Sequence, residues 1–425
     1  MRVAIIGGGW AGLAAAVTLA EQQVPVTLFE SAAQLGGRAR RVDINGLPLD
    51  NGQHILIGAY RETLRLLQRV GIQPDQACFA PPLTLQVAPE FRLQAASLPA
   101  PWHLGLGLLR SQGLSLREKF SALRFLRALQ RMQFHVDAGL SVAALLTQHG
   151  QSMRLLDYLW NPLCLAALNT APDQASAQIF INVLRDAFFA QQADSRLLLP
   201  LIDLGALFPD AAARYLRAQG ATLHCNRRIQ GIEVRDAGYA LQHAQGTEHF
   251  SQVICAIPPF RIPQLFAQIP GMQAIVSTLA TWRYQPIYTV YLQYDAGLRL
   301  PFPMLGLSQS ISQWVFDRGL TGQLGLLAVI ISAQGRHEAL SHDDLVLQVR
   351  EDLRLALQIT ATPQWTRVIA EKRATFSCAP NLQRPQNQTP LPGLYLAGDY
   401  TASDYPATLE SAMRSGVASA RLALS

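Results

Sequence analysis

The 425-residue chain lacks the patterns that usually signal metal sites, disulfides or nucleic-acid contacts. Its five cysteines show no C-x-x-C spacing, and several lie in apolar runs, where free buried thiols are the usual finding. Only Lys119 and Lys372 are lysines, and most arginines, which carry almost all of the net charge of +6, are spread along the chain. A nucleic-acid surface would need clustered basic residues interleaved with aromatics. We therefore expect neither a metal nor a nucleic-acid partner.

Long apolar runs are missing too, although the chain is apolar overall. Hydrophobic residues make up 49% of the chain and charged residues only 15%, yet no uninterrupted apolar run reaches the roughly 18 residues of a membrane-spanning helix. No signal peptide precedes the first expected strand, which begins at Arg2. There is no internal repeat and no low-complexity tract. These observations predict a large cytoplasmic enzyme with an unusually apolar surface or interior cavity.

A dinucleotide-binding fingerprint occupies the first thirty residues. An apolar run over residues 2–6 predicts a buried strand, residues 13–21 predict a helix, and the G-x-G-x-x-G of Gly7–Gly12 lies between them. A second expected strand over residues 24–29 ends at Glu30, whose carboxylate would accept hydrogen bonds from the adenosine ribose. Together these features predict a βαβ unit that binds a dinucleotide.

Each glycine of the motif has its own physical role. Gly7 allows a sharp turn out of the strand, and Gly9 lets a pyrophosphate approach the backbone. Gly12 permits the helix to pack closely on the sheet. The pyrophosphate then lies at the helix N-terminus, where free N–H groups and the helix dipole favour an anion.

Two further segments identify the dinucleotide. Gly36-Gly37-Arg38 closely follows Glu30, and an expected strand near the other end of the chain ends in Gly398-Asp399. Thr408 is an expected N-cap of a helix that continues to about Arg421. These segments resemble the flavin amine oxidase and carotenoid desaturase superfamily, and the resemblance implies FAD as cofactor. It also implies that the arginine reaches the phosphates, and that the last helix points its positive end at the flavin ring.

The resemblance extends to two more segments. Residues 50–54 match the stretch that passes the flavin ring, and Ile229 matches the residue whose backbone lies against the adenine. The residues implied to bind FAD are Gly7, Gly9, Trp10, Ala11, Gly12, Glu30, Gly37, Arg38, Gly52, Gln53, His54, Ile229, Gly398, Asp399, Thr408 and Leu409.

The positions of these motifs predict the fold class. We expect an α/β protein with a Rossmann-like FAD-binding domain, of the amine oxidase or glutathione reductase type, and an inserted mixed α+β substrate domain. The FAD-binding domain is expected to be discontinuous, over residues 1–60, 205–260 and 365–425. The substrate-binding and membrane-associated domain is expected over 61–204, which is mostly helical in pattern, and 261–364, which contains strand candidates.

The insertions point to a substrate class. Residues 160–169, 286–292, 313–318 and 373–376 resemble the squalene-associated FAD-dependent desaturase family. That resemblance implies reductive removal of the hydroxyl from a C30 allylic alcohol, which gives squalene for hopanoid biosynthesis. It also implies prenyl-synthesis enzymes as partners. No second nucleotide fingerprint is found, so the electron donor stays unspecified.

Candidate catalytic groups follow from the chemistry. Loss of a hydroxyl from an allylic carbon needs a proton donor and tolerance of positive charge. Asp317 could protonate the oxygen if it is buried, and Tyr288 or Tyr291 could do so through a phenol. His54 lies in the segment expected to pass the flavin. Each also has a structural alternative: Asp317 as part of a surface ion pair or turn, the tyrosines in core packing, and His54 as a hydrogen-bonded structural group.

One segment predicts contact with a membrane. Ser115-Leu116-Arg117-Glu118 has the form of a capping box that opens a helix to about Met132, in which arginines alternate with large apolar residues. The apolar stretch 104–109 precedes it. A basic amphipathic helix beside an apolar segment indicates a peripheral site on the inner face of the cytoplasmic membrane. A core helix with a solvated basic face is the alternative.

Other functions remain open at this point. Another polyprenoid desaturase would share the cofactor motifs, and Lys372 keeps an amine oxidase possible, because such enzymes often place a lysine near the flavin. A flavin-bearing lipid carrier without turnover is the third alternative.

Overall fold

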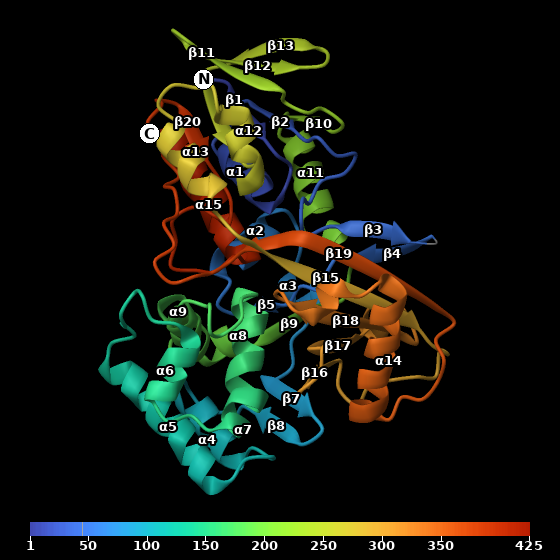
Figure 1. The fold of residues 1–425 in the computed structure, drawn as a ribbon. Helices are drawn as coiled ribbons and strands as arrows, with labels where there is room; N and C mark the ends of the chain where they lie inside the picture. Colours follow the sequence, from blue (N-terminus) through green and yellow to red (C-terminus); the bar gives the residue numbers. More distant parts are fainter. Residues whose placement is uncertain (45) are drawn as a thin grey trace.

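Two β-sheets, one parallel and one mixed, organise the chain, and the computed structural model describes residues 1–44 and 46–425 around them (Figure 1). The parallel sheet has the strand order β10-β2-β1-β14-β20, which places the first strand of the chain at its centre. Its strands are β10 (Thr222–His224), β2 (Val26–Phe29), β1 (Val3–Ile6), β14 (Gln252–Cys255) and β20 (Leu394–Leu396). The central strands are apolar because helices and loops cover both faces of the sheet.

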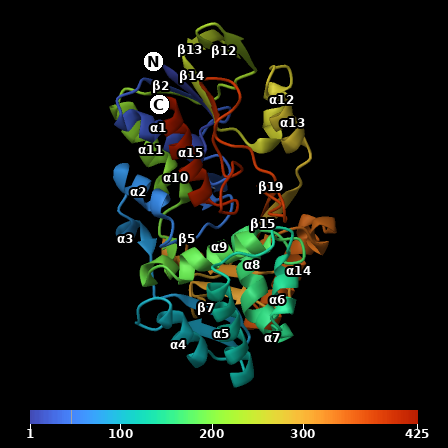
Figure 2. The same ribbon diagram turned by 90° about the vertical axis from the view of Figure 1, so that its left-hand side faces the viewer.

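Helices α1 (Trp10–Glu21) and α15 (Leu409–Leu424) pack side by side beside this sheet (Figures 1 and 2). Helix α1 is buried along nearly its whole length, as its alanine-rich sequence allows. Gly416 in α15 faces the α1 backbone so closely that an added Cβ would lie 2.2 Å from the carbonyl oxygen of Ala11. Helix α11 (Pro209–Ala218) packs against α1 as well.

A three-stranded antiparallel sheet flanks the parallel one at the upper end of Figure 1. It consists of β11 (Gly231–Arg235), β12 (Gly238–His243) and β13 (Gly246–Phe250). Two short helices, α12 (Ile262–Phe266) and α13 (Gln273–Ala280), follow β14 and lie beside this part of the molecule, and α12 contacts β11. Residues 262–280 therefore lie beside the cofactor side, whereas the sequence prediction placed them in the substrate domain.

The second large sheet has seven strands in the order β19-β15-β18-β17-β16-β7-β8. Its strands are β19 (Trp365–Phe376), β15 (Tyr284–Gln293), β18 (Leu326–Ser332), β17 (Trp314–Asp317), β16 (Met304–Leu307), β7 (Thr84–Ala88) and β8 (Phe91–Gln94). All neighbours are antiparallel except β16 and β7. Residues 365–376, which the sequence predicted to belong to the FAD-binding domain, form β19, and this strand pairs along β15 in the mixed sheet.

A helical lobe covers one side of the mixed sheet, and α14 (His342–Leu357) covers the other (Figure 1). The lobe contains α4 (Trp102–Arg110), α5 (Leu116–Arg131), α6 (Val142–Gln148), α7 (Met153–Leu155), α8 (Asn161–Leu168) and α9 (Ala177–Phe188). The capping box at the start of α5 is confirmed: the Ser115 hydroxyl accepts from the Glu118 backbone N–H, and the Glu118 carboxylate accepts from the Ser115 N–H. Among the described residues, no helix is long and apolar enough to cross a membrane.

Smaller elements connect the two halves. They are β3 (Arg41–Ile44), β4 (Leu47–Asp50), β5 (Leu56–Ile57), α2 (Arg61–Arg69), α3 (Pro74–Ala77), β6 (Cys78–Phe79), β9 (Leu197–Pro200) and α10 (Leu204–Leu207). The whole is an α/β fold in which a Rossmann-like parallel sheet is joined to an inserted α+β unit, as the sequence predicted.

The packing of α1 on α15 gives a first prediction. Gly416→Ala should lower the free energy of unfolding by about 1–3 kcal/mol, because the new Cβ would force the two helices apart. That loss exceeds the gain of at most about 1 kcal/mol that alanine brings to a helix interior.

Gly105→Ala in α4 is the matched control, since its Cβ would come no closer than 3.9 Å to the Leu123 side chain. It should leave stability unchanged or raise it. Urea unfolding, followed by circular dichroism, gives the free energy of unfolding of both variants. Equal changes in the two would contradict the claim that close packing of α1 on α15 stabilises the fold.

Candidate active site

One cavity of about 1180 Å³ runs from the glycine loop after β1 into the helical lobe. Its volume exceeds the roughly 300–1,000 Å³ of a pocket for one drug-sized ligand. The walls change character along its course. At one end lie the glycine loop, the polar loops after β2 and β4, and the start of α15; at the other end, α4, α5, α8, α9 and the mixed sheet contribute mainly apolar side chains. We call the second part the apolar arm.

At the polar end, a ligand can approach the protein backbone closely, because glycines bring no side chains there. Gly9 is the N-cap of α1 and brings no side chain to the helix start, so the first N–H groups of the helix are accessible. The loop at Gly37 passes directly over it: Gly9 pairs with Gly36, and a Cβ on Gly37 would lie 3.1 Å from the Gly9 Cα. Gly7, Gly9, Trp10, Ala11 and Gly37 all line the cavity.

Glu30 and Gly12 support this end in different ways. The Glu30 carboxylate accepts hydrogen bonds from the backbone N–H groups of Gly8 and Ala32, both at 2.7 Å, and borders the cavity. It is therefore held rigidly at the end of β2, where a ribose would pass. Gly12 does not border the cavity. It allows α1 to approach the loop, since a Cβ there would lie 1.9 Å from the Gly7 carbonyl oxygen.

Arg38 and Asp399 join the two ends of the chain inside the cavity. The Arg38 guanidinium donates to the Asp399 carboxylate at 2.6 Å and to the carbonyl of Ala374 at 2.7 Å. Arg384 holds the chain around Asp399 by donating to the carbonyls of Asp399 and Tyr405. Gly398 and Asp399 border the cavity, as predicted for a cofactor-contacting loop.

Helix α15 begins at this loop and points its N-terminus toward the cavity. Thr408 is its N-cap, as predicted, and accepts from the Ser411 backbone N–H at 3.2 Å. Thr408 and Leu409 line the cavity. The fully buried Glu410 accepts from the backbone N–H and the hydroxyl of Thr63, which ties α15 to α2. The positive helix end is thus fixed where it would stabilise negative charge on a reduced ring.

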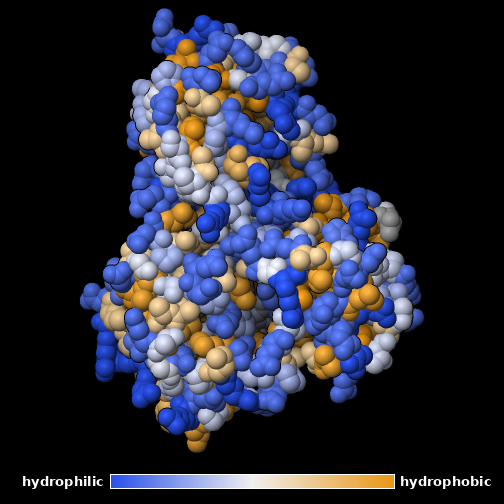
Figure 3. All heavy atoms as spheres, viewed as in Figure 1, coloured by the Kyte–Doolittle hydropathy of each residue, from blue (hydrophilic) through white to orange (hydrophobic). Residues whose placement is uncertain are grey.

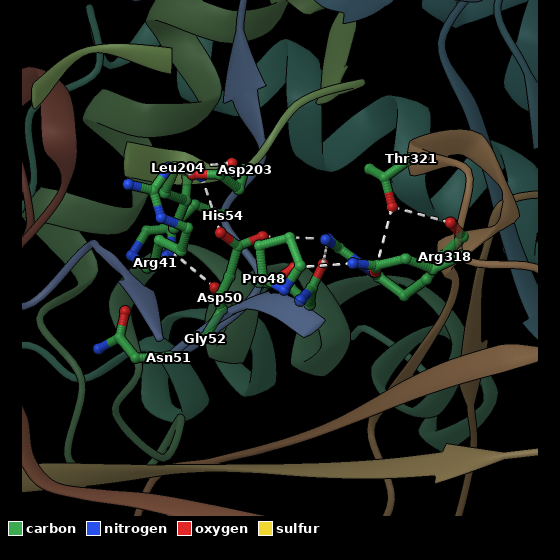
Figure 4. Close-up of polar contacts among 12 residues, drawn as sticks. Arg41, Pro48, Asp50, Asn51, Gly52, His54, Asp203, Leu204, Arg318 and Thr321 are labelled. Carbon is green, nitrogen blue, oxygen red and sulfur yellow. Dashed lines mark hydrogen bonds and ion pairs between the residues drawn. The ribbon is translucent and has the colours of Figure 1, made fainter. Parts of the chain in front are cut away.

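A buried ion pair fixes the loop after β4. Asp50 Oδ2 and Arg318 Nη1 are 3.1 Å apart, and both side chains are at least 94% buried (Figure 4). Burial raises the pKa of Asp50, and the Arg318 guanidinium opposes that rise. Arg318 also donates to the side chain of Gln53 at 2.7 Å, and Tyr291 donates to the Asp50 carbonyl at 2.7 Å.

The same pair borders a second chamber of about 30 Å³, close to the volume of one water molecule. Nη2 of Arg318 is buried there without a hydrogen-bond partner among the residues that the structure describes. Gln53 and His54 line both this chamber and the main cavity, and Gly52 lines the main cavity.

His54 therefore lies at the junction of the polar end and the apolar arm. Its Nδ1 is 3.1 Å from the Gly52 carbonyl oxygen, and burial lowers the pKa of its imidazole. A neutral ring that donates from Nδ1 leaves Nε2 as an acceptor. The adenine-side residue of the prediction, Ile229, also lines the cavity, close to Arg227 and Arg228.

The candidate acids Asp317 and Tyr288 do not face the cavity. Asp317 accepts from the backbone N–H groups of Leu300 and Gly319, and Tyr288 packs edge-on against His337 on the α14 side of the sheet. The reason is strand alternation: their neighbours Phe316 and Ile287 point into the cavity. Their predicted contact with substrate is corrected accordingly.

Sequence reasoning missed several residues of the cavity wall. Tyr400 borders the polar end; its buried hydroxyl has no partner in the described part of the chain, and burial raises its pKa well above the usual value. Asn169 ends α8 in a left-handed conformation and donates to the Thr375 hydroxyl at 2.9 Å, which ties the lobe to β19. Lys372 is exposed and does not line the cavity.

Comparisons with known proteins agree with this geometry. A family model described as flavin containing amine oxidoreductase matches residues 10–424. Hydroxysqualene dehydroxylase of Zymomonas mobilis is 27% identical, over 99% of this chain and 98% of that protein. The 15-cis-phytoene desaturase of Glycine max is 26% identical, over 98% of this chain and 78% of that protein. The solved cyclohexylamine oxidase from Brevibacterium oxydans matches with a TM-score of 0.74 at 17% identity, over 100% and 98% of the two chains, which shows the shared fold.

The Glu30 carboxylate gives a second prediction. Glu30→Ala should weaken FAD binding roughly 10–100-fold, because hydrogen bonds to a charged group contribute about 1.5–3 kcal/mol each. Titration of the apoprotein with FAD, followed by flavin fluorescence, measures the change. Glu21→Ala is the control in the same βαβ unit, since Glu21 pairs with Arg69 at 2.7 Å outside the cavity. Equal affinities of the two variants would remove Glu30 from the binding site.

The Asp50–Arg318 ion pair gives a third prediction. Asp50→Asn should lower the free energy of unfolding by about 3–5 kcal/mol, because it leaves a buried guanidinium without a counter-charge. The double variant Asp50→Asn/Arg318→Met should recover part of the loss, since no buried charge remains.

Glu351→Gln breaks an exposed pair with Arg354 and should leave the unfolding midpoint unchanged. Chemical denaturation of the three variants is the measurement. If Asp50→Asn lowers the free energy of unfolding no more than Glu351→Gln does, the buried pair does not hold the loop.

Proposed function

The chain belongs to the flavin-containing amine oxidoreductase family, and we propose that this FAD-dependent oxidoreductase reduces hydroxysqualene, an allylic C30 alcohol, to squalene. The observation that carries the proposal is the apolar arm, which continues the cofactor end of the cavity without a separating wall. The relative named hydroxysqualene dehydroxylase covers nearly the full chain and supports the same substrate class.

The apolar arm suits a hydrocarbon chain. Among the described residues of α4, α5, α8, α9 and the mixed sheet, Glu371 of β19 is the only Asp, Glu, Lys, Arg or His that lines the cavity, and His54 lies at the junction with the polar end. Burying a flexible polyprenoid there removes apolar surface from water, at about 25 cal/mol per Å². The large apolar side chains of the arm are Leu83, Leu85, Leu93, Leu104, Leu108, Leu126, Leu159, Trp160, Leu163, Val183, Phe188, Met304, Trp314, Phe316 and Ile330.

The overall change breaks a C–O bond and forms a C–H bond at the same carbon. Reduced FAD, when bound, supplies the electron pair for the new bond as hydride. The hydroxyl leaves with one added proton as water. The aromatic side chains of Trp160, Trp314 and Phe316 line the arm, and a ring face turned toward an allylic carbon would stabilise positive charge there.

The proton for the leaving hydroxyl must come from the junction. His54 must first take up a proton, because its lowered pKa keeps the ring neutral near pH 7. Tyr60 and Tyr400 keep their phenolic protons, since burial raises the pKa of both, and both border the cavity. Tyr60 and Tyr400 replace Asp317 and Tyr288, and join His54, as candidates to hold or move the proton.

The alternatives fit the cavity less well or differently. An amine substrate would carry a positive charge into the apolar arm, where Glu371 is the only carboxylate of the described wall and already interacts with the Arg38 guanidinium. A desaturase would use the same arm but move electrons in the opposite direction, from substrate to oxidised flavin. A lipid carrier would bind the substrate without electron transfer.

Anaerobic titration of the reduced protein with hydroxysqualene separates these functions. We expect stoichiometric reoxidation of the flavin, followed by its visible absorption, with squalene as the only product. Binding without reoxidation indicates a carrier. Bleaching of the oxidised protein by a polyene or an amine assigns it to a desaturase or an oxidase, and either result overturns the proposal.

Ala167→Phe tests the use of the apolar arm in the same assay. Ala167 lies on α8 and borders the cavity, so a phenyl ring would narrow the arm. Reoxidation by hydroxysqualene should slow at least ~10-fold, while flavin content and chemical reduction of the flavin stay normal. Ala218→Phe, at the exposed end of α11, is the control and should react like the unaltered protein.

A further inference from the structure

The outer faces of α4 and α5 carry large apolar side chains in water. Trp102 is 71% exposed, Leu116 67% and Phe120 56%, which is unusual for residues of this size. Leu109, at the end of α4, is 39% exposed. We call these four side chains, with the exposed arginines described next, the α4–α5 face. Figure 3 shows apolar atoms beside polar ones at the lower tip of the molecule, over these helices.

The same face is strongly basic. On α5 the exposed residues Arg117, Phe120, Arg124, Arg127 and Arg131 recur at intervals of three and four, so they share one side of the helix. Residues 91–136 contain seven basic residues and one acidic residue. Their formal charge of +6 equals that of the whole chain, so the remainder is neutral overall.

The single acidic residue of this segment does not neutralise the stripe. Glu118 closes the capping box with Ser115 and accepts from the Ser152 hydroxyl at 3.0 Å. The buried Lys119 donates from Nζ to the Leu109 carbonyl at 3.0 Å, which holds the end of α4 against α5. The two helices therefore present their apolar and basic side chains on a fixed frame.

The inner faces of these helices form part of the cavity wall. Leu104 and Leu108 of α4 and Leu126 of α5 line the apolar arm. One layer of two helices thus separates the arm from the exposed apolar face. A ligand that moves from this face into the cavity would pass between α4 and α5.

We propose that the α4–α5 face docks on the surface of an anionic lipid bilayer, and that the apolar substrate enters the arm from the bilayer between these helices. Trp102, Leu116 and Phe120 would insert into the headgroup region, and the arginine stripe would pair with lipid phosphates. The docking claim stands on the exposed side chains and charge alone. The entry claim rests on the proposed function.

A second copy of the chain is the main competing occupant of this face. Two such faces would bring like charges together, which opposes self-association. An anionic lipid bilayer matches both the arginines and the apolar side chains of the face, because it has negative charge at its surface and an apolar layer beneath. The observations therefore favour lipid.

Cosedimentation with vesicles, without substrate, tests the docking. The holoprotein should bind vesicles of phosphatidylcholine and phosphatidylglycerol, bind phosphatidylcholine alone more weakly, and lose affinity as salt rises. Trp102→Ser/Phe120→Ser should weaken binding roughly ten-fold or more. Leu347→Ser/Leu355→Ser removes two similarly exposed side chains from α14 and should have no effect.

The charge has its own matched pair of variants. Arg124→Gln/Arg127→Gln should reduce binding to the anionic vesicles roughly ten-fold or more, whereas Arg214→Gln/Arg217→Gln on α11 should not, although both lower the net charge equally. No vesicle binding, equal losses in the two pairs, or a lipid-free dimer that Trp102→Ser/Phe120→Ser dissociates would each overturn the docking.

Substrate delivery is measured separately. Flavin reoxidation by hydroxysqualene dissolved in anionic vesicles should slow at least ~10-fold in Trp102→Ser/Phe120→Ser, while reoxidation by substrate in detergent micelles stays unchanged. If Trp102→Ser/Phe120→Ser and the unaltered protein react at equal rates with substrate in vesicles, entry through this face is overturned. If the unaltered protein reacts in neither medium, the proposed function fails and the vesicle-binding result still stands.

Discussion

The buried ion pair between Asp50 and Arg318 is the interaction that holds the two halves of the active site together. Asp50 is the last residue of the β3–β4 hairpin on the cofactor side, and Arg318 follows β17 of the mixed sheet. Pairing two charges away from water brings little net stability, because desolvation offsets most of their attraction. Its value is in placement: the pair and its bonds to Gln53 and Tyr291 fix the segment that ends at His54.

The cofactor end was predictable because its signals are local. The glycine loop and Glu30 lie within a few residues of the elements that they terminate, so their spacing reveals them. Gly36-Gly37-Arg38 and Gly398-Asp399 are short segments that were found through their resemblance to the flavin amine oxidase and carotenoid desaturase superfamily. The structure brings these segments to one cavity, although they come from opposite ends of the chain. Strand order in the parallel sheet explains this, since β1 lies between β2 and β14, and β14 pairs with β20.

The substrate side was less predictable because its geometry depends on distant pairing. Which side chains of β15 and β17 face the cavity depends on register, and a change of one residue exchanges the two faces. Asp317 and Tyr288 were therefore chosen by residue type. Their side chains lie on the face of the mixed sheet that is turned away from the main cavity. The placement of β19 depended in the same way on its long pairing with β15. Tyr400 directly follows Asp399, so the Gly398-Asp399 segment could have identified it as a residue of the cavity wall.

The packing of α1 on α15 has a consequence for biogenesis. Residues 22–408 separate the two helices, so roughly 20–80 s of synthesis, at about 5–20 residues per second, lie between their emergence from the ribosome. Until α15 appears, the nascent chain presents a glycine loop without its second wall and an apolar arm without its flavin. The complete cofactor site therefore forms late in synthesis, once β20 has closed the parallel sheet and α15 has followed it.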